Sequence, residues 1–459
     1  MKNSKQKEMI LNENLWKVMF QLSWPAVIAM ILYGLNTVAD VIFVGRFVGE
    51  MALAGVSLAY PLTQITLGLG SLVGVGAGSA LSIAIGANDH DTQKKLLGNA
   101  NYLNILFTLI FTVIGTVFAT ELVKMMGGYG EELIFGVNYF KVTVYGSFFW
   151  IAGLAGNMIV RAEGKMKSAA VMMGIGLIVN IIANYILIVI LKLGVKGAAI
   201  GTNIGMIVYT ITSLVYFSRK KATFDAKPFS INRDKKIMKS ILSMGVPSFI
   251  MTIMCLIQAI VVLNALTNFG TISDVAFYGL TYRVFTFMLT PIFGLMRALQ
   301  PVIGINFGAC KHDRVIRSFK IFAIGGALIM LPFWLVMMLS PKMILSLMLP
   351  HKSFVIGEIM NFRIYMALLP LLPMIFMSMT FFPSINKGKH ASIMGIARQL
   401  LFYVPVMIIM PRFFGIKWVY IGSFLIDSII ILWATIIVAR EFKVLKGSNE
   451  KFNLHLGGN

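Results

Sequence analysis

Asp40 is an acidic residue inside a long apolar stretch, and polar side chains recur at a matching depth in two other stretches. Asn36 lies one helical turn before Asp40 and on the same helix face. Asn180 and Asn184 repeat this four-residue spacing in the fifth apolar stretch, and Thr202 lies near the start of the sixth. An ionised Asp costs roughly 2.5–3.5 kcal/mol at mid-membrane, so such a residue is a candidate for function. We predict that Asp40, Asn180, Asn184 and Thr202 form one site.

The residue types at this site define what it could bind. Oxygen atoms from a carboxylate, two amides and a hydroxyl suit a hard monovalent cation such as Na⁺. A buried carboxyl group could carry a proton instead. The structural alternative is a hydrogen-bonded network that only holds three helices together. The second half of the chain has Val262 at the position corresponding to Asp40, with Val404 and Ile408 near the asparagine equivalents. Packing common to both halves therefore does not require these polar residues.

Other polar residues inside apolar stretches are candidates for a substrate cleft. Hydrogen bonding between helices is the favoured interpretation of Gln258 and Gln300, and Arg283 is most simply a snorkelling or ion-paired side chain. Asp427 is a second intramembrane acid, for which pairing with a Ser and a position facing the cleft stay open. The cleft candidates are Asn36, Gln64, Gln258, Arg283 and Gln300.

The elements that must position these residues are membrane-spanning helices. The chain is 58% hydrophobic and 13% charged, unlike a soluble domain. Several stretches exceed the roughly 18–20 apolar residues that cross a bilayer, and the first continues too far to be a cleavable signal peptide. We expect helices near 16–45, 52–86, 97–120, 133–160, 168–191, 195–217, 239–268, 275–308, 316–340, 354–385, 390–411 and 416–440.

The second six stretches repeat the first six at a spacing of about 222 residues. Pro25 recurs as Pro247, and the segment 86–91 recurs as 308–313. Because each half has six spans, both halves enter the membrane in the same orientation. The sequence thus predicts an all-α polytopic membrane protein of twelve transmembrane helices. Its two six-helix bundles are related by a pseudo-two-fold axis along the membrane normal, with a central cleft between them. The halves are 1–217 and 239–459, joined by an exposed linker, 218–238.

The net charge of +22 reflects topology and does not indicate nucleic-acid binding. Lys and Arg concentrate in the loops of one side, in the linker and at both termini. The positive-inside rule places these segments in the cytoplasm, and an even number of spans satisfies it at every loop. We expect attraction to anionic lipids, a location in the bacterial inner membrane and a monomeric state.

The sequence contains little that points to enzyme chemistry. The chain has no phosphate-binding loop of Walker type and no Ser/His/Asp or paired-carboxylate arrangement inside the spans. Its five histidines lack metal-ligand spacing, and its two cysteines, Cys255 and Cys310, are not expected to form a disulfide. We expect no enzyme activity and no cofactor.

Three segments resemble the multidrug and toxic compound extrusion (MATE) family, and the resemblance covers essentially the whole chain. The segment Asp-Val-Ile-Phe-Val-Gly-Arg, 40–46, resembles the family's helix 1 signature. The segment Gln-Pro-Val-Ile-Gly-Ile-Asn-Phe-Gly-Ala, 300–309, resembles the helix 8 signature of its bacterial branch. The segment Arg-Ala-Glu-Gly-Lys, 161–165, is similar to the family's loop after helix 4.

The resemblance implies efflux of cationic and amphipathic compounds in exchange for protons or sodium, by alternating access between two lobes. The family's N-lobe cation site would fall on Asp40, Asn180, Asn184 and Thr202. Asn184 departs from the family pattern, where an Asp is usual, which should weaken sodium binding. Carboxylates that some members place in the C-lobe are absent.

Two other interpretations stay open. A lipid-linked oligosaccharide flippase of the same superfamily would need a cleft lined with cationic residues, whereas the embedded arginines here are few and mostly in helix 8. A receptor or an intramembrane enzyme is a more distant alternative. The internal repeat argues against a receptor, and the missing catalytic residues argue against an enzyme.

Overall fold

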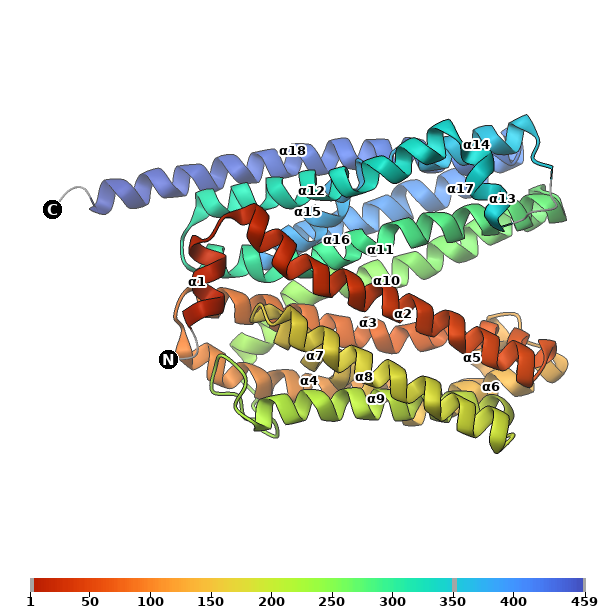
Figure 1. Cartoon of the computed structure of the whole chain (residues 1–459), viewed down its shortest axis with the longest axis horizontal. Coiled ribbons are helices and arrows are strands. Elements are labelled where there is room, and N and C mark those ends of the chain that lie inside the picture. Colours follow the sequence, from red (N-terminus) through yellow and green to blue (C-terminus); the bar gives the residue numbers. More distant parts are fainter. Residues whose placement is uncertain (1–3, 349–352, 457–459) are drawn as a thin grey trace.

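The computed structural model describes residues 4–348 and 353–456, and every regular element in those ranges is a helix. The helices form two lobes that lie side by side, α3–α9 in one and α10–α18 in the other (Figure 1). Both chain ends lie at the same end of the molecule, which we call the terminal end; the opposite end is the distal end (Figure 1). The two parallel bundles predicted from the repeat are confirmed. The last three residues of the predicted second half, 457–459, lie outside the described residues.

The helix bounds are as follows. The N-terminal half contains α1 (Ser4–Asn12), α2 (Leu15–Phe47), α3 (Glu50–Gly86), α4 (His90–Val117), α5 (Ala119–Met125), α6 (Gly130–Tyr145), α7 (Ser147–Ala162), α8 (Met166–Asn184), the π-helix η1 (Tyr185–Ile190) and α9 (Gly194–Ser218). The C-terminal half contains α10 (Lys235–Phe269), α11 (Ile272–Gly308), α12 (His312–Leu339), α13 (Pro341–Met348), α14 (Ile356–Met366), α15 (Leu372–Ser384), α16 (Gly388–Ile396), the π-helix η2 (Ala397–Tyr403), α17 (Val404–Phe414) and α18 (Lys417–Leu456).

Ten helices in the described residues are long and apolar enough to cross a membrane. The predicted fourth span is divided into α6 and α7, which meet at a bend of 55° and would together make an eleventh. The predicted tenth span, 354–385, consists of two shorter helices, α14 and α15. The last helix, α18, runs on to Leu456, well beyond the predicted end near residue 440, and projects past the bundle at the terminal end (Figure 1).

Glycines bring the two lobes into backbone contact near the terminal end. A Cβ atom on Gly76 of α3 would lie 2.0 Å from the backbone oxygen of Ile241, and one on Gly245 of α10 would lie 1.8 Å from that of Leu72. Gly86 and Gly308 make the same kind of contact between α3 and α11. Because small residues let helix backbones approach closely in lipid, this packing replaces the hydrophobic effect that would drive association in water. The lobes are closed against each other at this end.

The short helix α1 lies across the terminal end and contacts both lobes (Figure 1). Gln6 Nε2 donates to the backbone oxygen of Gly164 in the N-terminal lobe at 2.7 Å. Arg314 Nε of the C-terminal lobe donates to the backbone oxygen of Ile10 at 2.9 Å. We did not predict this helix, and it adds a polar bridge to the apolar closure of the lobes.

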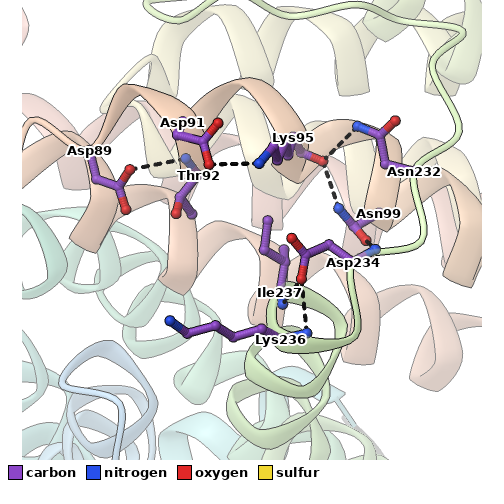
Figure 2. A network of polar contacts seen from close by, with 9 residues as sticks. All are labelled: Asp89, Asp91, Thr92, Lys95, Asn99, Asn232, Asp234, Lys236 and Ile237. Carbon is purple, nitrogen blue, oxygen red and sulfur yellow. Dashed lines mark hydrogen bonds and ion pairs between the residues drawn. The ribbon is translucent and has the colours of Figure 1, made fainter.

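The linker between the halves is largely exposed, as we predicted, and it is also docked on α4. The backbone N–H of Asn232 donates to the backbone oxygen of Gly98 at 3.1 Å, and the backbone N–H of Asp234 donates to Asn99 Oδ1 at 2.8 Å. Asn101 Nδ2 donates to the backbone oxygens of Pro228 and Ser230. Figure 2 shows how Asn99 of α4 and Asn232 and Asp234 of the linker meet beside Lys95. Side-chain amides on α4 thus satisfy backbone groups that water would otherwise bind.

Glu163, in the turn between α7 and α8, holds the linker from the other side. Its carboxylate is buried and accepts a hydrogen bond from the backbone N–H of Thr223. Burial raises the pKa of Glu163 to about 7, although the Thr223 hydrogen bonds and the charge of Lys165 favour the ionised form. Glu163 therefore holds its proton to a higher pH in the folded chain than in the unfolded one.

We expect substitution of Gly245 by Val to push the lobes apart at the terminal end. The added Cβ would lie 1.8 Å from Leu72 O, against 3.4–4 Å for ordinary contact, so α10 must move by about 1.5 Å or more. Spin labels at Lys94 and Lys389, in a chain without its native cysteines, report this distance by electron–electron double resonance.

Gly279→Val in α11 is the matched control, because a Cβ there meets nothing within 4 Å. The label distance should stay unchanged in that variant. An unchanged distance in Gly245→Val as well would show that the backbone contact does not hold the lobes together.

Glu163→Gln should remove a pH dependence of stability. Because the pKa rises from its ordinary 4.5 to about 7 on folding, the stabilisation is complete below pH 4.5 and is lost as the pH rises through 7. The full difference is roughly 3 kcal/mol. The midpoint temperature of thermal unfolding, measured in detergent, should fall as the pH rises from 4.5 to 8. This fall should be steeper in the native protein than in Glu163→Gln. Parallel curves for the two proteins would contradict the assignment.

Candidate functional site

The site predicted around Asp40 brings together side chains from α2, α8 and α9. Asn184 Nδ2 donates to Asp40 Oδ1 at 2.6 Å, which joins α2 to α8. Asn184 is the last residue of α8, directly before the π-helix η1. Asn184 is buried and Asp40 is half-buried, so the hydrogen bond lies away from bulk water. A bond to an ionised carboxylate in such surroundings is shorter and stronger than one between neutral groups.

Polar side chains beside this pair line a small cavity of about 50 Å³ inside the N-terminal lobe. Asn36, Asn180 and Thr202 line it together with Tyr33 and Tyr209. The Oδ1 atoms of Asn36, Asn180 and Asn184 are buried and accept no hydrogen bond from the protein. Thr202 Oγ1 donates to the backbone oxygen of Ala198 at 2.9 Å, which leaves its lone pairs free to accept.

Two glycines of α9 let the asparagines of α8 approach. A Cβ on Gly201 would lie 2.1 Å from Asn184 Oδ1, and one on Gly205 would lie 2.7 Å from Asn180 Cβ. Our sequence analysis did not assign either residue a role at the site. Their signal is their spacing, because Gly201, Thr202 and Gly205 share the face of α9 that meets α8. The site therefore depends on close helix packing as much as on its polar residues.

The arrangement suits a small cation. The oxygens of Asp40, Asn180, Asn184 and Thr202 are the hard ligands that a monovalent metal ion prefers, and the three orphaned amide oxygens fit that role. A proton on Asp40 fits equally well, because one carboxylate gives the group a single negative charge. Within the described residues, no group of three or more His, Cys, Asp or Glu side chains could hold a transition metal.

A second cavity, of about 280 Å³, lies between the lobes, and we call it the inter-lobe cavity. Gln300, a predicted cleft residue, lines it and also bridges the lobes, since Nε2 donates to Val75 O and Ser79 Oγ at 3.0 Å each. Both roles considered for Gln300 therefore occur together. The cavity is lined by Met30, Ser71, Val75, Ser79, Met158, Arg161, Pro247, Ser248, Met251, Thr252, Phe293, Met296, Arg297, Gln300, Met379, Thr380 and Pro383.

The other predicted cleft residues lie elsewhere. Asn36 belongs to the cavity beside Asp40. Gln258 accepts a hydrogen bond from Gln399 Nε2 at 2.6 Å, the helix-to-helix contact that the sequence favoured. Gln64 is half-buried on α3 and Arg283 is exposed on α11, and neither lines the inter-lobe cavity. Gln300 is the one residue of the five that the inter-lobe cavity includes.

Asp427 has a partner that we did not consider. Arg398 Nη2 lies 2.7 Å from Asp427 Oδ1, and Nε of the same arginine donates to that oxygen at 2.9 Å. Pairing with a Ser, one of the two predictions, is therefore wrong. Arg398 lies in the π-helix η2, at a position whose contacts local spacing does not reveal. The pair is a self-neutralised unit of the C-terminal lobe.

We expect Gly201→Ala to break the Asp40–Asn184 hydrogen bond, because the new Cβ would overlap Asn184 Oδ1. The free energy of unfolding should fall by about 1–3 kcal/mol. At low pH the infrared carbonyl band of the Asp40 carboxyl group, identified by its loss in Asp40→Asn, should move to higher frequency. Gly174→Ala in α8 is the control, because its Cβ would meet only Leu32 Cδ1, at 4.0 Å. An unmoved band in Gly201→Ala would contradict the geometry.

Comparisons with known proteins match most of the chain. The family model described as MatE matches residues 25–186 and 247–409, one match in each repeat. The "Multidrug export protein MepA" of Staphylococcus haemolyticus (strain JCSC1435) is 26% identical over 425 residues, 93% of either chain. The protein of the same name from Staphylococcus aureus (strain NCTC 8325 / PS 47) is 27% identical over 424 residues, 92% of this chain and 93% of its own.

The fold also matches solved structures. A structure described as the outward-facing conformation of a multidrug resistance MATE family transporter of the MOP superfamily superposes with a TM-score of 0.90. It is 25% identical, and the match covers 97% of this chain and 100% of that one. Together with the two family matches, this likeness confirms the resemblance noted in the sequence: the chain belongs to the MatE family.

Proposed function

We propose that this protein is a secondary active multidrug exporter that moves cationic and amphipathic compounds outward in exchange for H⁺ or Na⁺. Membership of a transporter family makes it a transport protein and not an enzyme. The observation that carries the proposal is the Asp40–Asn184 hydrogen bond, which lies beside orphaned amide oxygens. A membrane protein retains such a costly group where an ion or proton must bind.

The course of α2 supports coupling between this site and the lobes. Its distal half carries Asp40 and packs against α8, while its terminal half packs against α11 of the other lobe (Figure 1). A Cβ on Gly294 of α11 would lie 2.5 Å from Val27 of α2, which shows how close that contact is. A change in the charge of Asp40 therefore acts on a helix that touches both lobes. A ligand shifts such an equilibrium only through its differential affinity for the two states.

The inter-lobe cavity is the proposed substrate site. Five methionines and Phe293 form much of its wall, and these flexible, polarisable side chains adapt to different apolar ligands. The glycine contacts close the lobes on its terminal side, as release toward the distal side would require. Loops rich in Lys and Arg support a cytoplasmic terminal end in the bacterial inner membrane.

We expect Asp40→Asn to abolish gradient-driven export while leaving the fold intact. Proteoliposomes loaded with the cationic dye rhodamine 123 are given a pH gradient alone, then a sodium gradient alone. The native protein should export dye at least tenfold faster under one gradient, because ion binding at Asp40 drives the cycle. The variant should respond to neither gradient.

Asp91→Asn is the matched control, because Asp91 is an exposed acid at the terminal end, paired with Lys95. It should export like the native protein. Full gradient-driven export by Asp40→Asn would refute the coupling role. Gradient-independent dye movement by the native protein would refute antiport altogether.

A further inference from the structure

The inter-lobe cavity is lined by two arginines and by no acidic side chain. Arg161 comes from the last turn of α7 in one lobe, and Arg297 comes from α11 in the other. Our sequence analysis placed Arg161 among the basic loop residues, and that placement is wrong. The arginine lies within the helix and is only 5% exposed.

Both guanidinium groups have hydrogen-bonding capacity to spare. Nη1 of Arg161 and Nη1 of Arg297 are buried atoms with no hydrogen-bond partner. Neither side chain forms an ion pair with any residue in the part of the chain that the structure describes. Arg161 lies beside the hydroxyl of Tyr209, which gives it a polar neighbour but no counter-charge. The contrast with Arg398, which is paired with Asp427, shows that this chain can neutralise an embedded arginine.

An unpaired guanidinium in a low-dielectric site is unfavourable, so its retention on a cavity wall favours a ligand that supplies the missing charge. A planar guanidinium matches a carboxylate or a phosphate, to which it donates two parallel hydrogen bonds. The rest of the wall is apolar, with Met30, Met251 and Phe293 among its members. The cavity therefore offers an oxyanion site next to a surface for a hydrophobic body.

We propose that Arg161 and Arg297 form an oxyanion subsite of the inter-lobe cavity, which takes the carboxylate or phosphate of a zwitterionic or anionic amphipathic molecule. The inference rests on the proposed function, because it assigns a substrate class to the same cavity. It widens that class beyond purely cationic compounds. Two sources share this chemistry, an acidic compound from solution and an anionic phospholipid from the bilayer.

Two dyes test the subsite directly. Rhodamine 110 carries a free carboxylate, and rhodamine 123 is its methyl ester, so the pair differs at the group in question. Binding to the full-length protein in a neutral detergent is measured by fluorescence polarisation, without any ion gradient. Arg297→Gln should weaken rhodamine 110 binding about tenfold or more, the loss of one charge-assisted hydrogen bond. Rhodamine 123 affinity should change less than about twofold.

Arg161 is buried, so Arg161→Gln is accompanied by Arg161→Lys, which keeps the charge but loses the planar fork. Rhodamine 110 affinity should fall in the order native, Arg161→Lys, Arg161→Gln. Arg412→Gln, which removes an exposed charge in the last turn of α17, should bind both dyes like the native protein. If Arg297→Gln and Arg161→Lys each lost affinity for the two dyes equally, the subsite would be overturned. Unchanged affinity for the two dyes in these variants would overturn it as well.

Phosphatidylglycerol and phosphatidylcholine, added in turn to the micelles, distinguish the sources. Displacement of rhodamine 110 by phosphatidylglycerol alone, lost in Arg297→Gln, supports the subsite and identifies a bilayer lipid as a ligand. If the variants lose affinity for rhodamine 110 selectively and phosphatidylglycerol does not displace this dye, the result supports a subsite for acidic compounds from solution. Failure of the proposed function would appear separately, as absent gradient-driven export of rhodamine 123.

Discussion

The structure depends on how a carboxylate is kept inside a membrane. Asp40 is held by a hydrogen bond from Asn184, and Asn184 lies at a contact between α8 and α9 that only small residues on α9 permit. In a medium of low dielectric constant, a satisfied hydrogen bond is strong and an unsatisfied polar atom is costly. The orphaned amide oxygens next to the pair therefore leave room for the ion that we propose binds there. The surrounding helices keep these amide oxygens in place although they accept no hydrogen bond from the protein.

Close helix packing at glycine residues holds these helices in position. Glycines on α9 admit Asn180 and Asn184, and glycines on α3, α10 and α11 bring the lobes together at the terminal end. At the terminal end the glycines meet backbone oxygens of the other lobe, whereas the glycines of α9 meet chiefly the side chains of the two asparagines. Packed interfaces of this kind are bistable and do not deform continuously, so a local change in charge can become a change in lobe contact. The polar site and the closure of the lobes thus rely on the same physical device.

Sequence patterns predicted the features that repeat or that carry an obvious cost. The twelve apolar stretches and the internal repeat predicted the two-lobe fold, and the cost of embedding Asp40 pointed to its polar companions. Features set by contacts across the fold were missed. Arg161 looked like a loop residue because the predicted helix ended near residue 160, yet it lies in α7 and lines the inter-lobe cavity. The partner of Asp427 lies 29 residues away, a distance that helical spacing cannot bridge.

The charges of the two lobes differ in a way that separates ion binding from substrate binding. Asp40 of α2 has no basic partner among the described residues, whereas Asp427 of the C-terminal lobe is neutralised by Arg398. The inter-lobe cavity carries the reverse charge, from Arg161 and Arg297, and Asp40 is not part of its wall. An ion and a substrate therefore need not compete for one carboxylate. Their coupling must then pass through a structural element that both sites bias, and α2, which contacts both lobes, is the helix placed to provide it.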